Sequence, residues 1–391
     1  MSKLVASLIV AGLAAAVGAG GPRAEPVQEL EPPSGRIAVV SRSAYGTFLA
    51  IRDLAGTRST PLTAPPGRTN RRRDLFPKWS PDGSSVAFGR SRRGSWGHYV
   101  ARLGGGVRRV AAFSGFVWSP DSRQLVGGLP APCVGQRPDA AALLVAPARG
   151  GTVRRLQALP PQERPTATRS AHVSVRDWSR RGELLYVVAT TNPGDGCREH
   201  HAVRSLWRMR ANGTGRRVVA RRREIGDAAW SPNGRSIAFV VGRAGDFGCD
   251  VLVKTGGEAP RRLRSVAFDP AGCYGDSLSG TSIEWSADGR EVFVGDGRNL
   301  LAVDVRTRAA RFVLRGEAGQ ECSSVYACSM RVAAVSPDGA YVVAEQRAVP
   351  DQRVPGALWV IGRGGERWAL PYPAGAELWG ETFDVRVSPA R

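Results

Sequence analysis

Trp79-Ser80-Pro81-Asp82-Gly83 is the first of seven related phrases in this sequence of 391 residues. The phrases begin 39 to 60 residues apart, and self-similarity at such a period is typical of repeat architectures. The other six phrases are Trp118-Ser119-Pro120-Asp121-Ser122, Trp178-Ser179-Arg180-Arg181-Gly182, Trp230-Ser231-Pro232-Asn233-Gly234, Trp285-Ser286-Ala287-Asp288-Gly289, Val335-Ser336-Pro337-Asp338-Gly339 and the shorter Val387-Ser388-Pro389. The repeat therefore decides the fold before any residue is considered for chemistry.

Each phrase is a turn followed by strands. Pro presets φ, Asp or Asn bonds the following backbone, and Gly takes the closing conformation. Apolar runs such as Val86-Ala87-Phe88 and Ile237-Ala238-Phe239-Val240 follow the turns and predict strands. A third and a fourth strand follow, joined by hairpin turns such as Gly104-Gly105-Gly106. Each unit is predicted to be a four-stranded antiparallel meander, which is the blade of a β-propeller.

The two ends of the chain predict how the ring of blades closes. Residues 36–63 match strands two to four of a blade, and residues 383–389 match a first strand. Pairing between these two stretches would complete the N-terminal blade and leave no open sheet edge there. The fold class is therefore predicted as all-β, a closed seven-bladed β-propeller. Six blades is the alternative, if the unit between Trp79 and Trp118 or the unit around Trp178 is not a full blade.

The phrase with its following Ile/Val-Ala-Phe, and the later Leu206-Trp207-Arg208-Met209, resembles the WD40-like Pro-Asp repeat of TolB-type β-propellers. The best matches are residues 76–89 and 227–240, and the resemblance covers nearly all of residues 36–389. It implies a propeller fold. TolB proteins also carry an N-terminal α/β domain, for which this chain has no room.

The N-terminus predicts export. A short basic start, Met1-Ser2-Lys3, precedes an apolar run that is too short to span a bilayer. We expect residues 1–24 to be a secretory signal peptide, 25–35 a loose lead-in and 36–391 one propeller domain. An uncleaved membrane anchor is the alternative. The mature protein is expected to be secreted or to stay in the cell envelope or periplasm, without a transmembrane segment.

Six cysteines in an exported chain favour disulfides over free thiols. Their positions within the repeats bring certain pairs near one another, although fifteen pairings are possible in principle. The predicted pairs are Cys322–Cys328, Cys249–Cys273 and Cys133–Cys197.

The formal net charge is +21, and nearly all of the basic residues are arginine. Such a field favours anionic partners, so we expect a protein or an anionic cell-envelope polymer as partner, no nucleic acid, and a monomer. Two arginine triplets precede anchor tryptophans, in loops that share one face of the ring. We predict that they form a cationic rim for binding; solvated loops without a partner are the alternative. The triplets are Arg71, Arg72, Arg73 and Arg221, Arg222, Arg223.

Acidic residues lie at the start of several first strands, which line the centre of a propeller. They are candidates for a site at the channel mouth, or they simply face water there. These residues are Asp74, Asp177, Asp227, Glu284 and Asp384. Asp195, Cys197, His200 and His201 lie close together in sequence, but a structural zinc site needs four well-spaced ligands and we expect Cys197 to be oxidised. We therefore predict no metal and no cofactor.

Known catalytic motifs are absent from the sequence. It has no Gly-x-Ser-x-Gly, no His-Glu-x-x-His and no phosphate-binding Gly-rich loop. The predicted function is an exported, non-catalytic propeller that binds a protein or envelope component through one loop face, with no catalytic residue assigned. The alternative is an enzyme of the lyase, lactonase or hydrolase type with its active site at the central channel mouth.

Overall fold

A computed structural model of the chain describes residues 34–54, 58–129, 142–160, 170–191, 203–222, 225–242, 248–267, 283–295, 299–315, 330–346, 357–370 and 383–387. The chain divides into two units, Met1–Glu31 and Pro32–Arg391, and every described residue belongs to the second. Regular structure in these ranges is entirely β. They contain no helix that could cross a membrane.

The first sheet joins the two ends of the described chain. Its eight strands run in the order β28-β1-β2-β4-β5-β6-β7, with β3 paired to β2. The strands are β1 (Gly35–Ser43), β2 (Gly46–Asp53), β3 (Ser59–Pro61), β4 (Arg72–Trp79), β5 (Ser85–Arg92), β6 (Ser95–Arg102), β7 (Val107–Ala111) and β28 (Phe383–Val387). β28 pairs antiparallel with β1, with Ile37 opposite Val385, so the expected pairing between residues 383–389 and 36–63 is present. Two four-strand groups make up this sheet: β28 with β1–β3, and β4–β7.

Five four-stranded antiparallel sheets follow among the described residues, each built from four consecutive strands. The first two are β8 (Phe116–Trp118), β9 (Gln124–Gly128), β10 (Ala142–Pro147), β11 (Arg154–Gln157); and β12 (Ser170–Trp178), β13 (Glu183–Thr191), β14 (Val203–Arg210), β15 (Arg217–Arg222). The next two are β16 (Ile225–Trp230), β17 (Ser236–Gly242), β18 (Gly248–Thr255), β19 (Arg261–Ala267); and β20 (Ile283–Trp285), β21 (Glu291–Gly295), β22 (Leu300–Asp304), β23 (Ala310–Leu314). The last is β24 (Met330–Val335), β25 (Tyr341–Gln346), β26 (Ala357–Gly362), β27 (Arg367–Leu370).

The repeated phrase folds as a hydrogen-bonded turn between the first and second strands. Ser286 Oγ donates to Asp288 Oδ1 (2.7 Å) and accepts the N–H of Glu291 (2.9 Å). Asp288 Oδ1 also accepts the N–H of Arg290, and the N–H of Gly289 donates to the Ser286 carbonyl. Gly289 has φ +70°, which explains the glycine. The same bonds recur in the turns that begin at Ser80, Ser119, Ser231 and Ser336.

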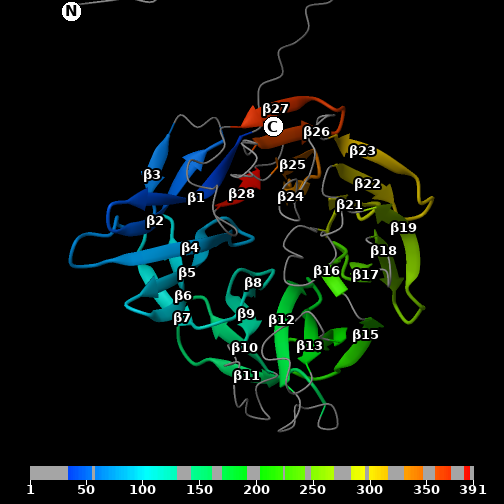
Figure 1. Ribbon diagram of the computed structural model, residues 1–391, viewed down its shortest axis with the longest axis horizontal. Helices are drawn as coiled ribbons and strands as arrows, with labels where there is room; N and C mark the ends of the chain where they lie inside the picture. The colour runs from blue at the N-terminus through cyan, green and yellow to red at the C-terminus, as the bar shows by residue number, and fades with distance from the viewer. Residues whose placement is uncertain are drawn as a thin grey trace, which may run out of the picture. The chain divides into compact units, whose positions relative to one another are not determined.

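The core lies between neighbouring four-strand groups, because both faces of each strand are covered. On β1, Ile37 and Val39 pack against the sheet of β24–β27, whereas Ala38 and Val40 pack against β4–β7. The described residues contain seven such apolar clusters, each between two groups that are neighbours in chain order, the last group packing on the first. Figure 1 shows the sheets following one another around a common centre. All-β structure built from these groups is that of a β-propeller.

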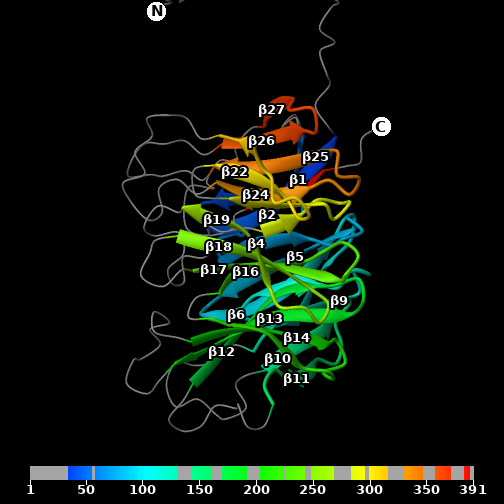
Figure 2. The ribbon, with the colours of Figure 1, turned by 90° about the vertical axis from the view of Figure 1, so that its right-hand side faces the viewer.

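The groups have two distinct faces. Consecutive phrase turns touch one another: the N–H of Asp82 donates to Ser122 Oγ (3.0 Å), and Arg181 Nε donates to the Asn233 carbonyl (3.0 Å). These turns therefore lie on one side, called here the turn face. The connections from strand two to three and from one group to the next lie at the opposite strand ends, on what we call the loop face. In the side view the strands run between these two faces (Figure 2).

Candidate functional site

The first strand of each group lies on the inner side and contacts the first strand of a neighbouring group. In four of them the pairing with the second strand shifts register: between Leu75 and Lys78, Val175 and Asp177, Ile225 and Ala228, and Val332 and Ala334. A β-bulge redirects the side chains around it. Phe76 lies within the first of these bulges with φ +56°, an uncommon conformation for a bulky residue. The bulges therefore affect the direction of charged side chains on the inner strands, such as Asp177 and Asp227.

Asp177, on β12, is half-buried and holds two backbone N–H groups. Its Oδ1 accepts the N–H of Trp178 (2.6 Å), and its Oδ2 accepts the N–H of Trp230 on β16 (2.7 Å). Burial raises the pKa of Asp177 to about 6, and the nearby charge of Asp227 adds to the rise, although both hydrogen bonds oppose it. The carboxylate thus joins two inner strands.

Asp227, on β16, repeats this arrangement one sheet further along. Its Oδ1 accepts the N–H of Ala228 (2.9 Å) and its Oδ2 accepts the more distant N–H of Ile283 on β20 (3.4 Å). Burial raises the pKa of Asp227, whereas the positive charges of Arg176 and Lys78 oppose the rise. Side chains from β4, β12 and β16 are therefore in electrostatic contact on the inner side, two of them acidic and two basic.

Asp74, on β4, is fully buried, and arginine side chains compensate its negative charge. Arg90 forms two hydrogen bonds with it, Nε to Oδ1 (2.6 Å) and Nη2 to Oδ2 (2.8 Å). Thr63 Oγ1 also donates to Oδ2 (2.8 Å), and Arg72 Nε lies 3.6 Å from the same oxygen. Because every contact holds Asp74 within the fold, this member of the predicted channel-mouth set is part of the core.

The other two acidic candidates differ from these three. Glu284 is exposed on β20, between buried Ile283 and Trp285. Asp384 lies on β28, where its backbone is paired with Ala38, and its side chain is outside the described structure. The structure thus relates Asp177 and Asp227 to each other, but not Asp74.

The predicted cationic rim is only partly at the surface. Arg71 and Arg73 are exposed at the start of β4, while Arg72 is buried against Asp74 and also donates to the Ala64 carbonyl. Arg221 is exposed near the end of β15, with its guanidinium over the Trp207 ring (5.6 Å). The side chain of Arg222 and all of Arg223 are outside the described residues.

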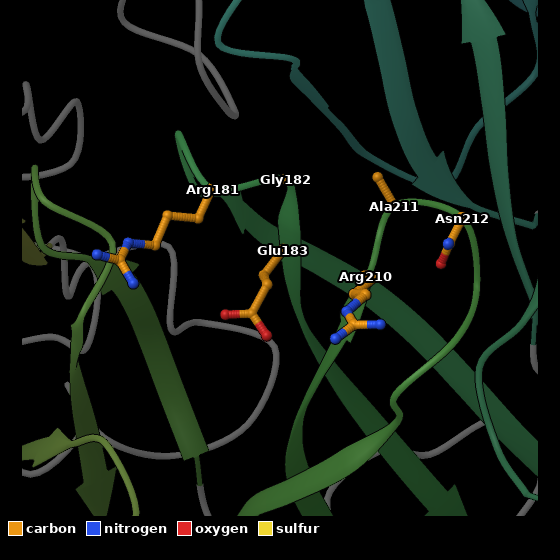
Figure 3. Close-up of a pocket in the computed structure, with 6 residues that line it drawn as sticks. All are labelled: Arg181, Gly182, Glu183, Arg210, Ala211 and Asn212. Atoms are coloured by element: carbon orange, nitrogen blue, oxygen red, sulfur yellow. The ribbon is translucent and has the colours of Figure 1, made fainter.

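A shallow open cavity of about 460 Å³ lies on the turn face of β12–β15, and sequence reasoning missed it. Figure 3 shows Arg181, Glu183 and Arg210 at its wall. Glu183 on β13 and Arg210 on β14 are opposite each other in the backbone register of the sheet. The phrase here reads Ser179-Arg180-Arg181-Gly182, without Pro and Asp, and Ser179 Oγ accepts an N–H one residue earlier than in the other turns. This departure from the repeated phrase is the sequence feature that could have indicated the cavity.

Most predicted disulfide and metal residues lie outside the described ranges. These are Cys133, Cys197, Cys273, Cys322, Cys328, Asp195, His200 and His201. Cys249, on β18, is fully buried and disulfide-bonded, but its partner is not among the described residues. The Cys249–Cys273 pair therefore stays a prediction. The described ranges hold no group of three or more potential metal ligands.

No protein-family model and no curated protein matches the sequence. Among solved structures, an oligogalacturonate lyase in complex with manganese has a TM-score of 0.53 and 16% identity, covering 86% of this chain and 84% of that one. The β-propeller domain of the Trilobed protease from Pyrococcus furiosus has a TM-score of 0.51 and 13% identity, covering 88% and 96%. TolB from Acinetobacter baumannii has a TM-score of 0.45 and 16% identity, covering 91% and 67%. At these identities the similarity shows the propeller fold alone, and that fold is the one the sequence predicted.

Proposed function

We propose that the protein is an exported, non-catalytic β-propeller that binds an anionic cell-envelope component or protein through its loop face. The observation that carries this proposal is the exposure of Arg71 and Arg73 at the start of β4 and of Arg221 at the end of β15, all at loop-face strand ends. Guanidinium groups in such positions attract carboxylates and phosphates, and the attraction weakens as salt screens it.

The scaffold of this proposal is a seven-bladed ring closed by β28. Pairing of β28 with β1 supports the closure, as does the apolar cluster between β24–β27 and β1–β2. The two units that left six blades as an alternative each contain four strands, β4–β7 and β12–β15. Export through residues 1–24 belongs to the same proposal, and N-terminal sequencing of protein recovered outside the producing cytoplasm tests it.

The binding test uses the purified protein on a column of immobilised anionic polymer. We expect retention at low salt and release as the salt concentration rises. Replacing Arg71, Arg73 and Arg221 by Gln should move release to lower salt. Retention that does not respond to salt, or no retention on any anionic polymer, would contradict the proposal.

A second candidate, an enzyme with its site at the inner strands, is favoured by one observation. Asp177 and Asp227 are two interacting carboxyls whose pKa values are both raised, with Arg176 and Lys78 in electrostatic range. A carboxyl with a pKa near 6 suits general acid–base chemistry. In a lyase reaction it would take the proton from the carbon next to a sugar carboxylate. The electron pair of that C–H bond would form a C=C bond as the C–O bond on the adjacent carbon breaks, and the carboxyl would then give the proton to the leaving oxygen.

Ultraviolet absorbance of the unsaturated product, measured with alginate as substrate, tests this second candidate. Activity that disappears in both Asp177→Asn and Asp227→Asn would support it. Equal activity in wild type and both variants would assign the two carboxylates to structure alone.

A further inference from the structure

The charge of the first two groups is strongly one-sided. Residues 34–113 contain fourteen arginines and one lysine, against the acidic residues Asp53, Asp74 and Asp82. Asp74 is buried with its arginines, Asp82 lies in a phrase turn, and Asp53 lies at the turn-face end of β2, paired with Arg36. Within residues 34–113 the loop face therefore has no exposed acidic residue; Asp384 on β28 belongs to the first group, but its side chain is outside the described structure.

One register row crosses five strands at this loop-face edge. Arg42 on β1 is opposite Thr47 on β2, Thr47 is bridged to Arg73 on β4, Arg73 is opposite Ser91 on β5, and Ser91 is opposite Trp96 on β6. The strands lie side by side in Figure 1. Four strand spacings give the row a length of about 19 Å.

The row is continuous because β2 and β4 make a short parallel bridge, which merges the two groups into one sheet. Gly46 permits the bridge. It has φ +140°, and a Cβ there would lie 1.8 Å from the Arg72 carbonyl oxygen. Since any other residue would push the strands apart, the sequence at Gly46 sets the distance between Arg42 and Arg73.

Six exposed arginines surround this row and are called here the arginine patch. They are Arg42, Arg68, Arg71, Arg73, Arg92 and Arg93. Within the described ranges, none of their guanidinium groups forms an ion pair with an acidic residue. Arg93 has φ +49° in the turn before Gly94, a position that Asn or Gly usually fills. The patch thus presents planar, bidentate donors for carboxylates or phosphates.

The side chains around the patch indicate which class of anionic ligand fits it best. The large apolar side chains that the described residues expose are Val107, Val153 and Phe312, and none lies at these connections. The patch therefore lacks the apolar centre of a protein interface and the apolar side chains that insert into a membrane. Trp96, half-buried at the end of the row and packed edge-on against Phe76 (6.0 Å), offers an indole surface of the kind that packs on a sugar ring.

We propose that the arginine patch binds an acidic polysaccharide, a linear polymer whose sugar units carry carboxylates. The proposal rests on the proposed binding function and deepens it by naming the surface and the class of ligand. The polymer lies along the row from Arg42 to Trp96, its carboxylates on the guanidinium groups and a sugar ring on the indole.

Fluorescence anisotropy of labelled alginate with the full-length protein tests this surface. The patch variant Arg42→Gln/Arg71→Gln/Arg73→Gln should weaken binding about tenfold or more. The matched control Arg180→Gln/Arg235→Gln/Arg290→Gln removes the same charge from exposed turn-face positions and should change affinity less than about twofold. Unchanged thermal midpoints in both variants establish that folding is intact.

Trp96→Phe separates sugar recognition from charge. It should weaken alginate binding while leaving the binding of polyphosphate unchanged. Equal losses in the patch and control variants would overturn this surface and the part of the proposed function that rests on Arg71 and Arg73; salt-sensitive retention on the anionic column would then still support binding of a polyanion. Polyphosphate or anionic phospholipid vesicles bound as tightly as alginate would overturn the polysaccharide. Absence of binding to every polyanion would overturn both proposals together.

Discussion

The carboxylate of Asp177 ties two sheets together: its Oδ2 accepts the backbone N–H of Trp230, 2.7 Å away on the neighbouring inner strand. Its other oxygen accepts the N–H of Trp178 on its own strand (2.6 Å). Asp227 makes the equivalent pair of bonds to Ala228 and Ile283. These carboxylates satisfy backbone donors of the inner strands and so link neighbouring groups.

Replacing Asp177 by Ala should lower the free energy of unfolding by about 2–3 kcal/mol, because two partly buried N–H groups lose their acceptor. Asp177→Asn retains one acceptor oxygen and should lose less. Urea denaturation measures both values. Glu258→Ala, at an exposed turn position, serves as the control, and an equal loss there would contradict the assignment.

The raised pKa of Asp177 predicts a particular dependence on pH. The folded value of about 6 lies above the ordinary value of 3.8, so between these values the folded protein binds the proton more tightly than the unfolded chain. The contribution of this group to stability should therefore rise as the pH falls from about 6 to about 4. As the pH falls across that window, the unfolding free energy of the wild type should increase relative to that of Asp177→Asn. A difference that stays constant with pH would refute the raised pKa.

His98 should show the opposite dependence. It is buried on β6, its Nδ1 accepts the N–H of Phe113 (3.1 Å), and burial, with the charge of Lys78, lowers its pKa to about 4. Because the ordinary value is 6.5, the unfolded chain takes the proton first on acidification. Stability from the neutral ring is present above pH 6.5 and is lost as the pH falls towards 4. An NMR titration of the His98 ring checks this, and a midpoint near 6.5 would exclude it.

Equally buried anchor tryptophans should respond unequally to loss of the indole N–H. Trp118 Nε1 donates to the Lys78 carbonyl (3.0 Å) across two groups, whereas Trp230 Nε1 is buried and has no hydrogen-bond partner among the described residues. Trp118→Phe should therefore cost about 1–2 kcal/mol more than Trp230→Phe. Thermal or urea unfolding of the two variants provides the comparison, and equal losses would show that the indole bond contributes nothing.

The phrase turns should depend on Ser more than on the identity of the acidic residue. Ser286→Ala removes both the donor to Asp288 and the acceptor for Glu291, and should cost about 1–3 kcal/mol. Asp288→Asn should be nearly neutral, because Asn233 makes the same bonds in its own turn. Differential scanning calorimetry of the two variants measures both losses of stability. A larger loss in Asp288→Asn than in Ser286→Ala would contradict this explanation.

Local patterns were enough to predict the strands and turns. Ser, Pro, Asp and Gly in sequence specify the turn because their bonds span five residues, as the Ser286 turn shows. The pairing of the two chain ends was also predictable, since residues 36–63 lacked a first strand. The site was not, because Asp74 and Asp177 look alike in sequence and differ only in which strands become their neighbours.

The sequence by itself determined a repeating four-stranded β unit and an excess of arginine, since both are properties of short stretches and of composition. Only the tertiary structure decided which charged side chains are paired inside the fold and which stay exposed. Packing placed Arg72 and Arg90 on buried Asp74, and the bridge at Gly46 aligned Arg42 with Arg73 in one row. The physical reason is that desolvation and ion pairing depend on distances between residues remote in the chain, which the pairing of the sheets sets.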